Sequence, residues 1–159
     1  MSELPLAPAA QRVQEKLRAA GSDCIVRMLP QTARSAADAA AAIGCEVAQI
    51  AKSLVFRAKS GKAVLIIASG ANRVDEGKLA AALGEAIGKA DADFVRERTG
   101  YAIGGVAPVG HDGSVRIFID EDLRRCPAIW AAAGHPHAVF PLDFAELERL
   151  TKGIVIAVK

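Results

Sequence analysis

The sequence AKSLVFRAKSGKAVLIIA, residues 51–68, decides the fold of this chain. Residues 51–58 have the composition of a β-strand, and the Lys-Ser-Gly-Lys segment at 59–62 is typical of a hairpin connection. Residues 63–68 are apolar throughout and have the length of a strand. A strand that is apolar on both faces is normally covered on both sides. We therefore expect residues 63–68 at the centre of a β-sheet, paired with residues 51–58.

Helices and further strands are interspersed on either side of this hairpin. Apolar periodicity and capping residues predict helices at 8–20, 36–43, 75–83, 91–98 and 143–151. Apolar runs predict strands at 24–29, 115–119, 128–133 and 154–158, with Asp112-Gly113 as a hairpin signal before the second of these. Strict alternation of strand and helix is absent. The pattern predicts an α/β (α+β) fold: a mixed, curved β-sheet or partly closed β-barrel with surrounding helices.

Length and composition predict one domain that spans residues 1–159. The chain is 52% hydrophobic but only 4% aromatic, so its core must be aliphatic. No apolar run reaches the roughly 18 residues of a membrane span, and the N-terminus does not resemble a secretory signal. The three cysteines are odd in number and widely spaced, which favours a reducing compartment. We expect a cytoplasmic protein with no membrane partner.

The net charge is too small to identify the chain as a nucleic-acid-binding protein. It is +2 at pH 7, with an isoelectric point near 8.5, whereas a basic domain that binds nucleic acid typically has a value above about 9. Contacts with a few phosphate groups remain compatible with this balance.

The segment GYAIGGVAPVG at residues 100–110, called the glycine loop below, is a candidate binding loop. Glycine adopts positive φ without a steric penalty and lets a ligand approach the main chain closely. Pro108 fixes its own φ and stiffens the end of the loop. Two interpretations are open, a turn that only reverses the chain or a rigid surface of backbone N–H and C=O groups.

Two side chains outside the glycine loop are further candidates. Lys52 shares a strand face with Leu54 and Phe56, so its ammonium lies either at the wet end of the strand or at the mouth of a pocket. His135 lies in a Gly-His-Pro turn, either as an exposed histidine or as part of a site.

Several familiar catalytic devices are absent from the sequence. There is no phosphate-binding G-x-x-x-x-G-K-[ST] motif and no G-x-S-x-G nucleophile elbow. His135-x-His137 lacks the further ligands of a zinc site, so we expect no metal and no cofactor. A lysine and a glycine-rich loop without a nucleophile indicate electrostatic preorganisation around a substrate that supplies part of its own chemistry.

Two motifs resemble one known family. Residues 50–56, IAKSLVF, resemble the lysine-bearing strand of the YbaK/prolyl-tRNA synthetase-associated domain family, and residues 99–110 resemble its T-G-Y…G-G-x-x-P-x-G loop. Residues 115–120 resemble the strand that follows this loop in the family. Residues 129–142 resemble the family's next strand and glycine turn. The resemblance runs from about residue 10 to the end of the chain, and it is to free-standing members of the YbaK/EbsC or ProX type.

The resemblance implies an aminoacyl-tRNA deacylase, a hydrolase that removes a wrongly attached amino acid, most often from tRNA for proline. Lys52 would bind the phosphate and ribose of the 3′-terminal adenosine, and the backbone of Gly104 would hold the aminoacyl group. The ribose hydroxyl of the tRNA would help to activate water. The implied partners are the acceptor end of a mischarged tRNA and an aminoacyl-tRNA synthetase. The alternative is a tRNA- or nucleic-acid-binding module without catalysis.

The chain departs from the family pattern around the expected pocket. Ser53 replaces a threonine of the cysteine-editing relatives, Ala132 replaces a serine, and Val139 replaces an acidic residue. The Gly134-His135-Pro136 turn looks more like relatives that edit small amino acids such as alanine. The predicted catalytic residue is Lys52, and the predicted substrate-binding residues are Ser53, Gly104, Gly105, Pro108, Ala132, Gly134 and His135.

Overall fold

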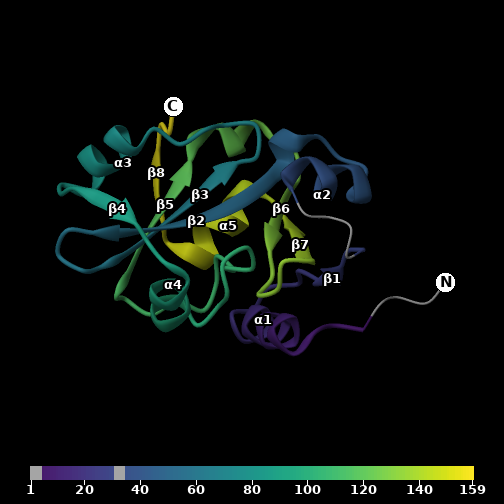
Figure 1. The fold of residues 1–159 in the computed structure, drawn as a ribbon. Coiled ribbons are helices and arrows are strands. Elements are labelled where there is room, and N and C mark those ends of the chain that lie inside the picture. The colour runs from purple at the N-terminus through teal and green to yellow at the C-terminus, as the bar shows by residue number, and fades with distance from the viewer. Residues whose placement is uncertain (1–4, 31–34) are drawn as a thin grey trace.

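The computed structural model describes residues 5–30 and 35–159, which form one mixed β-sheet surrounded by helices (Figure 1). Its eight strands are β1 (Arg27–Met28), β2 (Ile50–Ala58), β3 (Ala63–Ser69), β4 (Ile87–Lys89), β5 (Val115–Asp120), β6 (Ile129–Ala132), β7 (Ala138–Leu142) and β8 (Ile154–Ile156). The helices are α1 (Pro8–Ala19), α2 (Ala36–Ile43), α3 (Glu76–Leu83), α4 (Ala92–Thr99) and α5 (Phe144–Thr151), with 3₁₀ turns η1 (Val47–Gln49) and η2 (Glu121–Arg125).

The predicted hairpin forms the centre of the sheet. β2 and β3 are antiparallel from Ala51 opposite Ser69 to Arg57 opposite Ala63, and all seven residues of β3 are buried. The strand order is β1-β7-β6-β2-β3-β5-β8, with β4 pairing the far end of β2. The mixed sheet predicted from the sequence is therefore confirmed, and across the described residues it stays open and does not close into a barrel.

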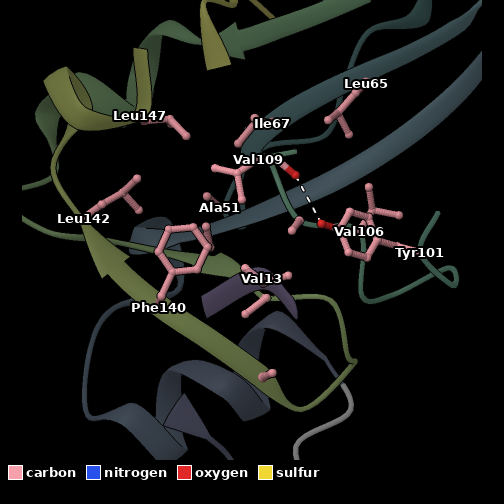
Figure 2. Packing of buried hydrophobic residues seen from close by; sticks show 14 of the residues in the cluster. Val13, Ala51, Leu65, Ile67, Tyr101, Val106, Val109, Phe140, Leu142 and Leu147 are labelled. Atoms are coloured by element: carbon pink, nitrogen blue, oxygen red, sulfur yellow. Dashed lines mark hydrogen bonds between the residues drawn. The ribbon is translucent and has the colours of Figure 1, made fainter. Parts of the chain in front are cut away.

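Alternate residues of the central strands pack on opposite faces of the sheet. On one face, Leu65 and Ile67 of β3 pack with α1, α4, α5 and the glycine loop, and Figure 2 shows Val13, Val106 and Leu147 converging there. On the other face, Val64 and Ile66 pack against α3, while α2 covers Val139 and Trp130 nearby. β3 is apolar on both sides because helices cover both.

The helix predictions are confirmed, because their start and stop signals are local. Ser35, Asp75, Asp91 and Asp143 each accept a hydrogen bond from a backbone N–H in the first turn of α2, α3, α4 and α5. Gly44, Gly84 and Gly100 end the first three of these helices in the left-handed conformation.

The structure differs from the strand predictions at several places. The Asp112-Gly113 hairpin is wrong, because β5 pairs in parallel with β3 and β8, and Asp112 instead accepts a hydrogen bond from the Ser114 N–H. The strand expected at 24–29 shortens to Arg27–Met28. β4 and β7 were not predicted; β7 contains Pro141, which argues against a strand in sequence but lies opposite Trp130 here. In the described part of the chain, no helix is long and apolar enough to span a membrane.

Candidate functional site

A small cavity brings together three of the predicted catalytic and substrate-binding residues. Lys52, Gly104 and Ala132 all line a space of about 170 Å³ between α2 and the strands β2, β6 and β7. The remaining lining residues are Ser35, Ala36, Ala39, Ile50, Ala51, Trp130, Pro136, Ala138 and Val139. Apolar and small side chains therefore make up most of the described part of this wall, and Lys52 is the one charged group among the lining residues that the structure describes.

The Lys52 side chain is half-buried and points to the α2–α3 face of the sheet. Leu54 and Phe56 pack on that same face, as the period-2 pattern predicts. The Lys52 ammonium donates a hydrogen bond of 2.6 Å to the main-chain carbonyl of Asn72. Within residues 5–30 and 35–159, no carboxylate forms an ion pair with it. Its positive charge is thus available to an anionic ligand.

The glycine loop meets the Gly134 turn backbone to backbone. Gly104 has a φ of +89° and lies 3.8 Å, measured from its ideal Cβ position, from the Pro136 ring. A Cβ on Gly105 would lie 2.9 Å from both the backbone nitrogen and the Cα of His135. Only glycine permits this approach. The packing fixes Gly104 at the edge of the cavity.

Side chains lock the glycine loop from its other end. The Tyr101 hydroxyl donates to the Val109 carbonyl at 3.2 Å (Figure 2). It also accepts a hydrogen bond from the Lys16 ammonium at 3.2 Å. The His111 ring lies edge-on to Tyr101, and its Nε2 contacts the Ala107 carbonyl at 2.6 Å. The segment is therefore a braced loop with fixed backbone groups, as a recognition surface requires.

The other predicted site residues lie outside this cavity. Ser53 pairs with Ile67 and faces the main core, where its buried hydroxyl has no hydrogen-bond partner among residues 5–30 and 35–159. Pro108 is buried within the loop. His135 lines a neighbouring cavity of about 550 Å³, and its Nδ1 accepts a hydrogen bond from the His137 N–H at 3.1 Å.

Gly134 holds the turn itself. Its φ is +88°, and a Cβ there would lie 2.7 Å from the Ala9 carbonyl oxygen of α1. The turn is therefore seated on α1, and through Gly105 it also supports the glycine loop. Its contribution to the cavity is indirect.

Sequence reasoning missed several residues that shape the site. Trp130 and Pro136 line the cavity, as do Ala36 and Ala39 of α2. Trp130 was within reach of prediction, because it lies two residues before Ala132 and so shares its strand face. Asn72 had no sequence signal, since it contacts Lys52 through its main chain.

A larger cavity of about 800 Å³ lies beyond the carboxyl ends of β3 and β5. Asn72, Asp122, Arg125, Cys45 and Cys126 are among its lining residues. Burial raises the pKa of the Cys45 and Cys126 thiols, so both stay protonated near neutral pH and neither is activated as a nucleophile.

An open mixed sheet with a lysine on a central strand and a braced glycine loop beside it defines a known class of domain. The family model for the aminoacyl-tRNA editing domain matches residues 30–150 of this chain. The chain belongs to that family, as the two motifs predicted.

Known relatives agree with this assignment. A solved structure reported as "a putative trans-editing enzyme for prolyl tRNA synthetase" is 45% identical, with a TM-score of 0.92 and coverage of 98% of this chain and 99% of that one. The uncharacterized protein YwhH of Bacillus subtilis is 32% identical over 113 residues, 71% of this chain and 72% of that protein. A proline–tRNA ligase of Brachyspira hyodysenteriae is 32% identical over 74 residues, which is 46% of this chain and 13% of the ligase.

Proposed function

We propose that this protein is a trans-editing deacylase that hydrolyses the ester bond of a mischarged tRNA. The observation that carries the proposal is the pairing of an uncompensated cation, Lys52, with the Gly104 backbone around one small apolar cavity. Membership of the editing-domain family and the 45% identical relative support it. We take residues 1–159 as one editing domain that acts in the cytoplasm.

The reaction needs no covalent intermediate with the protein. Water attacks the carbonyl carbon of the aminoacyl ester, the bond to the ribose oxygen breaks, and the free amino acid and tRNA leave. Lys52 binds the phosphate and ribose of the terminal adenosine, while the main chain at Gly104 holds the aminoacyl group. The neighbouring ribose hydroxyl of the tRNA assists the water. The contribution of the protein is positioning and preorganised charge.

The lining of the cavity supports a small aliphatic aminoacyl group such as alanine. Ala36, Ala39, Ala132 and Val139 offer no carboxylate to a polar side chain, and the indole of Trp130 limits the volume. The hydroxyl of Ser35 is engaged, since it accepts the Asp38 N–H at the start of α2. Because a single extra methylene is discriminated only about 10- to 200-fold, we expect a graded preference.

The partners we propose are the acceptor end of tRNA for proline and the prolyl-tRNA synthetase that charges it. The relationship to a proline–tRNA ligase over 74 residues supports this choice. Free amino-acid amides lack the ribose hydroxyl that assists the water, so we expect no amidase activity.

A deacylation panel tests the proposal. Purified protein is mixed with alanyl-, cysteinyl-, seryl- and 2-aminobutyryl-tRNA for proline, and with alanyl- and valyl-tRNA on their own tRNAs. We expect fastest loss of alanine from tRNA for proline, and a decrease of about tenfold or more in Lys52→Ala because one charge-assisted contact is lost. The exposed hairpin lysine supplies the matched control, Lys62→Ala. Full activity in Lys52→Ala would remove that role, and tRNA binding without deacylation would favour a non-catalytic binding module.

A further inference from the structure

The position of the Lys52 ammonium depends on a turn that follows β3. Lys52 contacts the main-chain carbonyl of Asn72 at 2.6 Å. Lysine has a long flexible side chain whose rotamers must be restricted before it can present its charge at one place. The location of the Asn72 carbonyl therefore decides where the ammonium lies.

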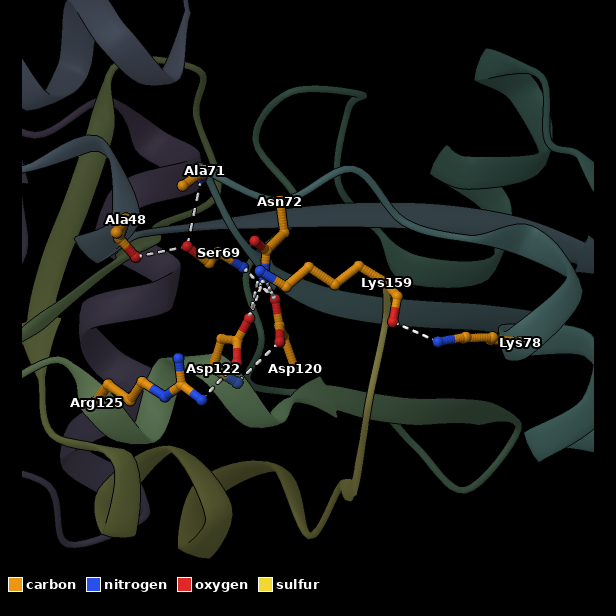
Figure 3. Close-up of polar contacts among 9 residues, drawn as sticks. All are labelled: Ala48, Ser69, Ala71, Asn72, Lys78, Asp120, Asp122, Arg125 and Lys159. Atoms are coloured by element: carbon orange, nitrogen blue, oxygen red, sulfur yellow. Dashed lines mark hydrogen bonds and ion pairs between the residues drawn. The ribbon is translucent and has the colours of Figure 1, made fainter.

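The Asn72 side chain is clamped between two carboxylates. Its Nδ2 donates to Oδ2 of Asp120 and to Oδ2 of Asp122, both at 2.8 Å (Figure 3). The amide orientation is well determined, because the opposite one would place its oxygen against two carboxylates. Asn72 is itself only 8% exposed. An asparagine bonded in this way has little freedom to move.

Both carboxylates are in turn fixed at the end of β5. Asp120 is fully buried and accepts the Ser69 N–H at 3.0 Å and the Asp122 N–H at 2.9 Å, besides the Asn72 amide. Asp122 also pairs with Lys159 at 3.4 Å. The hydrogen bond from Asn72, followed by Lys159 and Arg125, keeps the pKa of Asp122 below its usual range. The Asp122 carboxylate therefore stays charged across neutral pH.

We propose that Asn72 is a positioning residue for Lys52, held by Asp120 and Asp122 and acting through its own main-chain carbonyl. We call Lys52, Asn72, Asp120 and Asp122 the lysine support. The carbonyl restrains one of the three N–H groups of the ammonium and leaves the others free for an anionic ligand. A carbonyl partner also leaves the positive charge of the ammonium in place, whereas a carboxylate partner would neutralise it. This inference rests on the proposed function only for the identity of the ligand.

The first experiment measures the state of Lys52 without any substrate. Trace acetylation with acetic anhydride, followed by peptide mass spectrometry, gives the reaction rate of Lys52 relative to that of Lys62. We expect Asn72→Ala to raise the relative rate about threefold or more, because the main-chain carbonyl, which alanine keeps, is no longer held in place by the amide side chain. An unchanged relative rate would overturn the proposal. If Asn72→Ala does not fold, Asp122→Ala takes its place. A raised relative acetylation rate of Lys52 in that variant would again support the proposal, and an unchanged rate would overturn it.

A matched control separates this effect from general loosening. Gln49 is another amide side chain that bridges two segments beside the same large cavity: it donates to the Ala128 carbonyl and accepts the Glu46 N–H, both at 3.0 Å. Gln49→Ala should leave the Lys52 acetylation rate unchanged. An equal rise in Gln49→Ala and Asn72→Ala would contradict a specific role for Asn72.

The second experiment is a double-mutant cycle on single-turnover deacylation of alanyl-tRNA for proline. Asn72→Ala should slow the reaction about tenfold in the wild-type background and have no effect in the Lys52→Ala background, because it acts through that lysine. Equal slowing in both backgrounds would show a merely structural role. If the wild-type protein deacylates nothing, the proposed function fails, and the acetylation result still decides the role of Asn72.

Discussion

The lysine support and the glycine loop serve the same cavity but are held by different forces. In the lysine support, two carboxylates fix an asparagine through charge-assisted hydrogen bonds. In the glycine loop, the main chain is fixed by close packing against His135 and by the neutral Tyr101 hydroxyl. We therefore expect the lysine support to be more sensitive to the loss of a charged partner, and the glycine loop to be more sensitive to a change of shape. Substitutions that alter only one of these properties test this difference.

The largest loss of stability is expected from Asp120→Ala. This substitution removes the acceptor of three N–H donors, the buried ones of Ser69 and Asn72 and the partly buried one of Asp122. Each unsatisfied donor costs about 1–3 kcal/mol, so we expect a loss of about 3 kcal/mol or more from the free energy of unfolding. Urea denaturation followed by circular dichroism measures it. The exposed Asp112→Ala variant is the control, and similar losses in both would contradict the importance of the buried carboxylate.

The shape of the glycine loop is tested by Gly105→Ala. A new methyl group would lie 2.9 Å from backbone atoms of His135, which cannot move aside as a side chain can. We expect a loss of about 2 kcal/mol in stability and a strong decrease in deacylation, because Gly104 moves with its neighbour. Urea denaturation measures the loss of stability, and a deacylation assay on the same preparation measures the loss of activity.

Gly113→Ala is the matched control for this glycine. It lies just after the same loop, has no atom within 4 Å of an added Cβ, and has no positive φ. We expect a change within about 0.5 kcal/mol. A Gly105→Ala variant as stable and active as Gly113→Ala would show that the close contact with His135 is unimportant.

A smaller effect is expected from Tyr101→Phe. The ring stays in its buried place, but the hydrogen bonds to Val109 and Lys16 are lost. One net hydrogen bond corresponds to about 1 kcal/mol. We also expect the protease sensitivity of the loop to increase, while Lys52 acetylation, which reports on the lysine support, stays constant. A parallel rise in Lys52 acetylation would contradict the independence of the two regions.

The sequence predicted the glycine loop and Lys52 well because their signals are local. Four glycines and a proline in eleven residues, or a lysine on an apolar strand face, are visible without tertiary information. The helix boundaries at Asp75, Asp91 and Gly100 were visible for the same reason.

The rest of the site required the fold. Asn72, Asp120 and Asp122 meet only because β3 and β5 are parallel neighbours that end at the same edge, and the sequence wrongly predicted a hairpin before β5. Strand pairing between distant segments leaves no periodicity in the sequence. Ser53 shows a second limit: it is adjacent to Lys52 in the chain, yet successive strand residues face opposite sides of the sheet.

The smallest expected change in stability depends on pH and arises at His111, which directly follows the glycine loop. Burial lowers the pKa of His111 below its ordinary value of 6.5, although its bond to the Ala107 carbonyl acts in the other direction. That carbonyl can only accept, so Nε2 carries the hydrogen of the neutral ring. Protonation would place a second N–H on Nδ1, which is buried without a partner, with Lys16 also repelling the new charge and Asp112 favouring it.

The direction of the pH dependence follows from this shift. Because the unfolded chain takes up a proton at His111 before the folded protein does, stability is complete above pH 6.5 and decreases as the pH falls below that value. His111→Gln keeps a donor for Ala107 and should flatten this part of the curve, measured as the urea midpoint from pH 8 to about 5. Asp112→Asn gives the opposite comparison: it removes the carboxylate that favours the charged ring, so it should keep or deepen this loss and not flatten it. A His111→Gln protein that loses stability over the same range as the wild type would show that the loop has no such titrating group.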